Sequence, residues 1–202
     1  MILVRTDKTV AMSIQQDKSW PQHIIALFDY ARRKTPAVAN RFYGAYNGLL
    51  SYCFKLSEFA VAPQLTPKDD NGVPIGELVV YIIVYDTTTF HPVLLVEVKD
   101  DHWAESAETR SCADQLMRQH LDEMLGECER PRLWGLSLLG TAMRVYRADK
   151  ATHDVRPPFS AHRDRGQAPP PDYLEGEWNL DIMTQDGFDK MREIVDDIST
   201  GL

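Results

Sequence analysis

An acidic and a basic residue stand two positions apart at the end of one apolar segment. Residues 91–99 read His-Pro-Val-Leu-Leu-Val-Glu-Val-Lys, and the alternation of a β-strand places Glu97 and Lys99 on the same face. The residues before them are apolar, which is typical of a strand that is buried on both faces. A carboxylate and an ammonium group are costly in such a place unless they pair with each other or hold a metal ion.

This pair of groups suits the metal-assisted hydrolysis of a phosphodiester. The acid would hold a divalent cation, and the lysine would orient an attacking water or stabilise the charge that develops on the phosphate. The alternative is a plain ion pair between Glu97 and Lys99, or two charges that reach solvent, because Glu-x-Lys tripeptides are common. The composition, the charge and the order of elements in the rest of the chain bear on which interpretation applies.

The size and composition of the chain indicate one folded domain. It has 202 residues, 44% of them hydrophobic, and no apolar run is long enough to span a membrane, so we expect no membrane partner. Cys53, Cys112 and Cys128 have no paired spacing and are typical of an intracellular protein, cytoplasmic or nuclear. The oligomeric state is left open by the sequence.

The net charge of −8 limits how the chain could hold nucleic acid. Proteins that grip DNA by its phosphates usually present a basic face, so any such face has to be local here. We expect Arg110 and Arg118 at the rim of the Glu97 site, with Arg163 or Arg165 as further candidates. The alternative is that these arginines belong to an ordinary solvated surface. Other arginines that the sequence offers for a basic face are Arg130, Arg132, Arg144 and Arg147.

Hydrophobic spacing predicts helices and strands in a clear order. The predicted helices span about 21–34, 36–54, 104–128 and 184–200, and the predicted strands span about 59–64, 77–86, 92–99, 132–139 and 141–147. Gly44 and Gly48 lie four residues apart in the second helix and predict the close approach of another element. Residues 157–171, which are rich in Pro and Arg, are expected to form a surface excursion.

The order of these elements, with the acid and the lysine on the third core strand, resembles the PD-(D/E)XK nuclease superfamily, whose core is αβββαβ. The pattern of that superfamily is an acid at the start of the second strand, a gap, and then (D/E)-x-K on the third strand. Glu97 and Lys99 match its second half, and Glu77 matches its first acid. The resemblance implies a restriction-endonuclease-like α/β fold with a central mixed sheet flanked by helices and an extra C-terminal helix.

Several segments are also similar to a set of fungal PD-(D/E)XK-like proteins, and this resemblance covers roughly residues 35–150. The segments are Phe42–Asn47, Val61–Gln64, Leu95–Lys99, Ala113–Arg118 and Trp134–Thr141. We therefore expect a single domain over residues 1–202, with its core at about 35–150. The N-terminal helix, the Pro-rich segment and the last helix would be additions to that core.

The resemblance implies a role for each candidate residue. Glu77, Glu97 and the backbone carbonyl of Val98 would hold Mg²⁺ or Mn²⁺. Lys99 would assist the attack of water, and Gln115 on the long helix would orient that water or a phosphate oxygen. The chain departs from the superfamily because a Glu replaces the usual Asp at position 77 and because the predicted second helix carries no acid. The longer Glu77 would shift the metal or need a water between, and the missing helix acid favours one bound ion rather than two.

Other polar residues near the strand ends have plainer interpretations. Asp86 is expected to be a turn residue, and Asp114 is expected to be the salt-bridge partner of a nearby arginine. His120 is expected on the surface of the long helix. Trp103, near the mouth of the site, is the kind of residue that caps a core more often than it stacks on a base.

Three functions remain open from the sequence. The first is metal-dependent hydrolysis of phosphodiester bonds, with nucleic acid as the partner. The second is a nuclease scaffold without catalysis that serves as a binding module, and the third is the same scaffold used for acid–base chemistry on a small molecule. A basic groove beside Glu97 would favour the first, a site blocked by side chains would favour the second, and a closed apolar pocket would favour the third.

Overall fold

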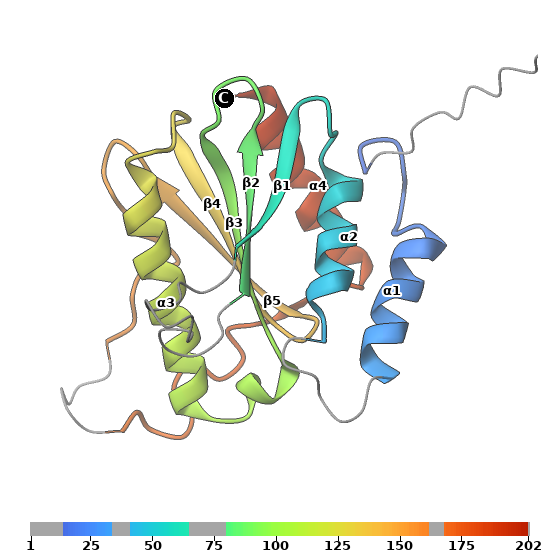
Figure 1. Ribbon diagram of the computed structural model, residues 1–202. Helices are drawn as coiled ribbons and strands as arrows, with labels where there is room; N and C mark the ends of the chain where they lie inside the picture. The colour runs from blue at the N-terminus through green and yellow to red at the C-terminus, as the bar shows by residue number, and fades with distance from the viewer. Residues whose placement is uncertain (1–13, 34–40, 65–79, 162–167, 202) are drawn as a thin grey trace, which may run out of the picture.

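A mixed, open β-sheet forms the centre of the protein, and helices cover both of its faces (Figure 1). The computed structural model describes residues 14–33, 41–64, 80–161 and 168–201. The protein is therefore an α/β protein with a mixed sheet flanked by helices, as the sequence predicts. Within the described part of the chain, no helix has the length and apolar character that crossing a membrane requires.

The elements follow the predicted order along the chain. The helices are α1 (Gln22–Arg33), α2 (Tyr43–Cys53), α3 (Ala107–Leu125) and α4 (Gln185–Thr200), with a short 3₁₀ turn η1 (Asp101–Ala104) before α3. The strands are β1 (Phe59–Gln64), β2 (Val80–Asp86), β3 (Pro92–Lys99), β4 (Arg132–Leu139), β5 (Ala142–Asp149), β6 (Val155–Arg156) and β7 (Leu180–Asp181). The last two strands were not predicted, because two residues are too few to carry a period.

The strands lie side by side in the order β1-β2-β3-β4-β5-β6, and β7 pairs with β5. All described neighbours are antiparallel except β3 and β4, which are parallel. A parallel pair needs a crossover connection, and α3 provides it. β3 therefore lies inside the sheet, as its apolar sequence predicts, and all eight of its residues are buried.

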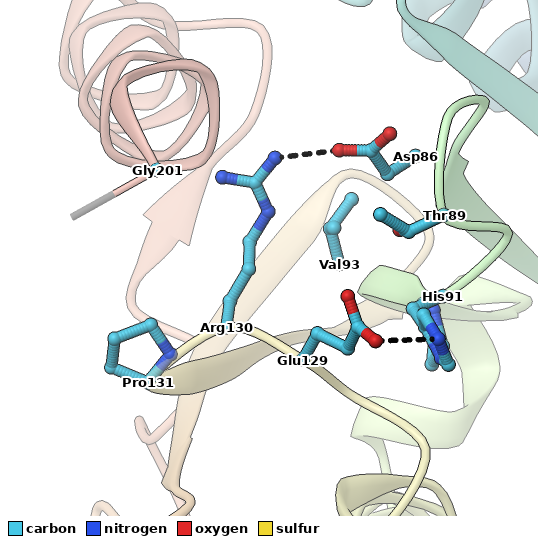
Figure 2. Close-up of a pocket in the computed structure, with 9 residues that line it drawn as sticks. Asp86, Thr89, His91, Val93, Glu129, Arg130, Pro131 and Gly201 are labelled. Atoms are coloured by element: carbon cyan, nitrogen blue, oxygen red, sulfur yellow. Dashed lines mark hydrogen bonds and ion pairs between the residues drawn. The ribbon is translucent and has the colours of Figure 1, made fainter.

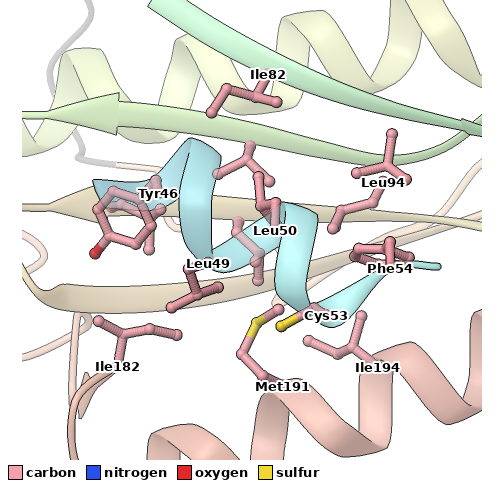
Figure 3. Close-up of a cluster of buried hydrophobic side chains, with 14 of the residues drawn as sticks. Tyr46, Leu49, Leu50, Cys53, Phe54, Ile82, Leu94, Ile182, Met191 and Ile194 are labelled. Atoms are coloured by element: carbon pink, nitrogen blue, oxygen red, sulfur yellow. The ribbon is translucent and has the colours of Figure 1, made fainter. Parts of the chain in front are cut away.

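The larger apolar core lies on the face of the sheet that α1, α2 and α4 cover (Figure 3). Tyr46, Leu49 and Leu50 of α2 pack into this core, and Met191 and Ile194 of α4 join them from the other end of the chain. Burial of apolar surface is the main favourable term in folding. The first and last helices therefore belong to the main core and are more than additions to it.

On the opposite face of the sheet, α3 packs a smaller apolar cluster. Its side chains Met117, Leu121 and Leu125 belong to one cluster with Leu95 of β3. Gly135 of β4 leaves room for this helix, because a Cβ atom there would lie 2.8 Å from the sulfur of Met117. Odd-numbered residues of β3 from Leu95 onward therefore face α3.

α3 begins three residues later than predicted because a separate turn precedes it. Ser106 is the N-cap of α3, and its hydroxyl accepts a hydrogen bond from the backbone N–H of Thr109 at 3.2 Å. Asp100 caps η1 in the same way, accepting from the backbone N–H of Asp101 at 2.8 Å. The η1 turn places Trp103 beside the end of β3.

Candidate functional site

Glu97 and Lys99 lie together, buried, on the face of the sheet that α3 covers. Strand alternation from Leu95, which packs in the α3 cluster, puts both charged side chains on that face. Lys99 Nζ lies 3.5 Å from Glu97 Oε1, and the side chains are 5% and 0% exposed. The structure brings these two candidates together, and it also forms the ion pair that the sequence offers as the alternative.

The carboxylate of Glu97 lacks hydrogen-bond donors. Within the described residues, neither of its buried oxygens has a hydrogen-bond partner, and the contact to Lys99 is too long to be a strong one. Buried carboxylates are normally satisfied by donors, so this group is an exception. Burial raises the pKa of Glu97 to about 7, and the charge of Lys99 opposes that shift. A bound cation would satisfy these oxygens.

The ring of Trp103 covers the amine of Lys99. Nζ lies 4.2 Å from the centroid of the ring, which is a cation–π contact. Thr109 of α3 holds the turn that carries this ring, because its hydroxyl donates to the backbone carbonyl of Trp103 at 2.8 Å. Lys99 is therefore enclosed between a carboxylate and an aromatic ring.

An acidic turn follows directly after Lys99. Asp100, Asp101 and His102 each offer a ligand atom, these atoms lie within 4.8 Å of one another, and they could hold a metal ion. Arg41 already places a cation there, since it donates to Asp100 Oδ1 at 3.1 Å and to Asp101 Oδ1 at 2.6 Å. The two carboxylates therefore act first as anchors for Arg41.

A row of polar side chains crosses four strands on the α3 face. Tyr81 of β2 pairs with Glu97, Glu97 pairs with Ser137 of β4, and Ser137 pairs with Arg144 of β5. Directly paired residues lie on one face with their Cβ atoms roughly 4.5–5.5 Å apart. Trp178 donates from Nε1 to the hydroxyl of Ser137 at 3.2 Å. Glu97 thus stands in the middle of a polar band within a largely apolar layer.

Asp114 of α3 anchors one end of this polar band. It is 1% exposed, and it accepts hydrogen bonds from Arg118 at 2.9 Å, from Arg144 at 3.0 Å and from the Tyr146 hydroxyl at 2.8 Å. Asp114 is therefore a salt-bridge partner, as expected. Removing either partner of such a buried pair would leave an uncompensated charge.

Arg110 and Arg118 do not form the basic rim that the sequence predicts around the Glu97 site. Arg110 is buried, and its guanidinium donates to three backbone carbonyls at 2.7–3.0 Å. Arg118 binds Asp114 and a backbone carbonyl. Both guanidinium groups hold loops onto α3 through these hydrogen bonds, so their donors are occupied within the protein. Arg163 and Arg165 lie outside the described residues.

Gln115 and His120 differ from their expected positions. Gln115 is exposed, and its side chain donates to the hydroxyl of Ser111 on the same helix at 3.1 Å. His120 was expected on the surface, but its ring packs against Tyr81 with the centroids 5.1 Å apart. Burial lowers the pKa of His120; the charge of Glu123 opposes this shift, and the charge of Lys99 adds to it. The imidazole is therefore a group near the site that the sequence did not reveal.

The structure says less about the other two predicted metal ligands, Glu77 and the carbonyl of Val98. Glu77 lies outside the described residues, as do residues 36–40 of the predicted second helix. The side chain of Val98 packs in the larger core on the opposite face. Only its backbone carbonyl is consistent with the role that the resemblance implies.

A separate pocket of about 250 Å³ lies at the other end of β3, beside the β2–β3 turn (Figure 2). Arg130 pairs with Asp86 at 2.9 Å, and His91 pairs with Glu129 at 3.1 Å. Asp86, at the end of β2, also accepts from the backbone N–H of Thr88 at 2.9 Å, so it holds the turn that follows, in line with the predicted turn role. The charged groups of this pocket are paired with one another.

Comparison of the chain with protein-family models, curated proteins and solved structures finds no match. Its function therefore has to be inferred from the geometry of its own residues.

Proposed function

We propose that the Glu97–Lys99 face is a metal-dependent site for hydrolysis of the phosphodiester bonds of nucleic acid. The observation that carries this proposal is the pair of buried Glu97 oxygens without hydrogen-bond donors among the described residues, next to a buried ammonium group. Hard divalent cations such as Mg²⁺ and Mn²⁺ take carboxylate oxygens as ligands, so the group present fits such an ion.

The order of elements supports a restriction-endonuclease-like core. α2, β1, β2, β3, α3 and β4 follow one another as αβββαβ, and the sheet keeps the first four strands in chain order. β3 and β4 are parallel across α3. Glu97 and Lys99 stand at the end of the third strand, which is where the PD-(D/E)XK pattern has its acid and lysine.

Each residue of the proposed site has its own role. Glu97 would hold the ion with the carbonyl of Val98, and Glu77 would complete the set. A bound ion supplies Lewis acidity to a phosphoryl oxygen and lowers the pKa of a bound water. Lys99 would donate from Nζ to a phosphoryl oxygen as negative charge develops there, or would hold the attacking water.

A substrate would have to displace Trp103 from Lys99. The two charged side chains are nearly inaccessible, and the ring occupies the space in front of Nζ. A phosphate oxygen would take the place of the ring as the partner of the ammonium group. Trp103 stands on the four-residue turn η1 and not on a long helix.

The same burial favours a second candidate, a nuclease scaffold that binds a partner without catalysis. Glu97 and Lys99 would then satisfy each other beneath Trp103, and no ion would enter. The internal use of Arg110 and Arg118, together with the net charge of −8, also favours this candidate over one that binds nucleic acid.

Calorimetric titration with Mg²⁺ and Mn²⁺ separates the two candidates. The variants are Glu97→Gln, Asp100→Asn for the acidic turn, and Glu123→Gln as a control that removes one exposed charge. Binding that is lost in Glu97→Gln and kept in the other two supports the proposed site. Loss in Asp100→Asn alone would place the ion at the turn, and no binding by the wild type would favour the second candidate.

Cleavage of labelled single- and double-stranded DNA and RNA in Mn²⁺ tests the chemistry itself. Lys99→Met keeps most of the side-chain volume and removes the charge, so we expect metal binding to persist. Cleavage should fall by about 100-fold or more, which is typical for the loss of one donor to a developing negative charge. Unchanged cleavage by Lys99→Met would remove Lys99 from the mechanism.

A further inference from the structure

Two arginines face each other across the short ladder between β5 and β6. Arg147 and Arg156 are direct partners in this antiparallel pair, so their side chains share one face of the sheet. Within the described residues, neither guanidinium has a hydrogen-bond or ion-pair partner. Like charges that lie directly opposite each other destabilise a sheet. The pair therefore has an electrostatic cost, and no hydrogen bond or ion pair of these two groups within the described residues offsets it.

The nearest carboxylate along β5 does not neutralise this pair. Asp149 lies two residues after Arg147 and feels its charge, which lowers the pKa of Asp149 as the weakest of several causes. Its Oδ1 accepts hydrogen bonds from the backbone N–H groups of Ala151 at 3.0 Å and Thr152 at 3.1 Å. Asp149 is thus bound to its own turn, and the hydrogen bond from the backbone of Thr152 is the main cause of its lowered pKa.

Such a pair is unusual in this protein, because acidic residues outnumber basic ones by 30 to 22. Most other arginines of the described segments form ion pairs with carboxylates. They are Arg32, Arg41, Arg118, Arg130, Arg132, Arg144 and Arg192. Two adjacent arginines without such a partner stand out against that background.

The two arginines line a pocket of about 250 Å³ between the sheet and α4. Lys190 and Glu193 of α4 also line it, and they pair with each other, so their charges cancel. Trp134 of β4 adds an apolar part to the lining. The uncompensated charge of the pocket therefore comes from Arg147 and Arg156.

This pocket lies on the opposite face of the sheet from Glu97. Val145 packs against the larger core, which α1, α2 and α4 cover, and Arg147 follows it by two residues on the same strand. Glu97 faces α3 instead. The pocket is therefore separate from the proposed hydrolytic site and is not part of its rim.

We propose that Arg147 and Arg156 form a binding site for a small phosphate-bearing anion. Paired guanidinium groups match phosphate oxygens, because each presents N–H donors in a planar fork that suits two parallel hydrogen bonds. The pocket is smaller than the roughly 300–1,000 Å³ that encloses a drug-sized ligand, which favours a phosphate group over a whole nucleotide. A dianion between the two arginines would turn their repulsion into attraction for a shared ligand.

Calorimetry with inorganic phosphate, at an ionic strength held constant with sodium chloride, tests this site. The variants are Arg147→Gln and Arg156→Gln, and Arg33→Gln at the exposed end of α1 is the matched control for one lost charge. We expect each pocket variant to bind phosphate at least tenfold more weakly and the control to bind like the wild type. Circular dichroism checks that all three variants are folded.

The alternative outcomes are distinct. The site is ruled out if the wild type binds phosphate no better than chloride, or if Arg33→Gln weakens binding as much as the pocket variants do.

Phenyl phosphate identifies the source of the phosphate: tighter binding than inorganic phosphate points to a phosphomonoester, and weaker binding points to the free ion. A short single-stranded oligonucleotide that binds through Arg147 and Arg156 more tightly than either would overturn the assignment to a small anion. All of these variants leave Glu97 intact, so the result is independent of the metal titration.

Discussion

The ammonium group of Lys99 lies 4.2 Å from the centre of the Trp103 ring, and it also lies 3.5 Å from Glu97 Oε1, so the ring and the carboxylate both cover the amine. A cation–π contact with a desolvated amine contributes about 2 kcal/mol. The η1 turn therefore decides whether reagents reach Lys99, and this dependence can be measured without knowing the substrate.

Replacing Trp103 with Ala should expose Lys99. We expect acetic anhydride to modify Lys99 several-fold faster in Trp103→Ala than in the wild type, as followed by peptide mass spectrometry. Lys55, whose side chain is 53% exposed, serves as the internal reference for reagent activity. Trp103→Phe keeps an aromatic ring and should stay close to the wild type. Equal modification of Lys99 in all three proteins would show that the ring does not control access.

Glu97 should make the stability of the protein depend on pH. Its pKa is about 7 in the folded protein, against an ordinary value of 4.5. Below about pH 4.5 the carboxyl is neutral in both states. Between about pH 5 and 7 the folded protein keeps a proton that the unfolded chain loses, so stability falls as the pH rises. The difference between the two pKa values corresponds to about 3 kcal/mol.

Urea denaturation from pH 5 to pH 8 measures this effect. The free energy of unfolding of Glu97→Gln lacks the contribution of this group, so the wild type should lose stability relative to the variant as the pH rises. The sign follows from the buried carboxyl, since ionising it without donors is unfavourable. Parallel curves for the two proteins would mean that Glu97 titrates near its ordinary pKa in the folded state.

The Asp114 cluster should contribute strongly to stability. Asp114→Asn leaves Arg144, which is 4% exposed, without its closest buried carboxylate, and we expect a loss of about 3–5 kcal/mol in the free energy of unfolding. Asp189→Asn removes an exposed helix pair with Arg192 and should change stability by less than about 1 kcal/mol. Chemical denaturation of both variants makes the comparison. Similar losses in the two would argue against a special role for the buried cluster.

Two glycines should respond in opposite directions to substitution by alanine. A Cβ atom at Gly44 in α2 meets nothing within 4 Å, so Gly44→Ala should stabilise the protein by about 0.5–1 kcal/mol through helix propensity. A Cβ atom at Gly187 in α4 would lie 2.3 Å from the backbone carbonyl oxygen of Asp181, so Gly187→Ala should destabilise by about 3 kcal/mol or more. Thermal denaturation tests both, and a destabilised Gly44→Ala would contradict the free space at that position.

Features that depend on local periodicity were predictable from the sequence. The alternation of β3 puts Glu97 and Lys99 on one face whatever the rest of the fold does, and the apolar run predicts its interior position. The paired glycines of α2 correctly predicted a close approach at Gly48, where Leu27 of α1 would lie 2.6 Å from an added Cβ atom. At Gly44 the same reasoning was wrong, because that side of the helix is open.

Features that depend on distant parts of the chain were not predictable. His120 faces Tyr81 only because of how α3 is rotated over the sheet, and its spacing from other polar residues gives no sign of this. The partners of Arg110 come from loops that lie up to 63 residues away. The juxtaposition of Arg147 and Arg156 needs the register of a two-residue strand, which no sequence period specifies.

The participation of α4 in the main core has a consequence for folding during synthesis. Trp20, just before α1, donates from Nε1 to the carbonyl of Ile182 at 2.6 Å and packs edge-on against Phe188, so the start of the described chain is held by its last fifth. Contacts of such long sequence separation form late. We expect α1 and α2 to leave the ribosome with their apolar sides uncovered and to depend on chaperones until residues 185–200 have been translated.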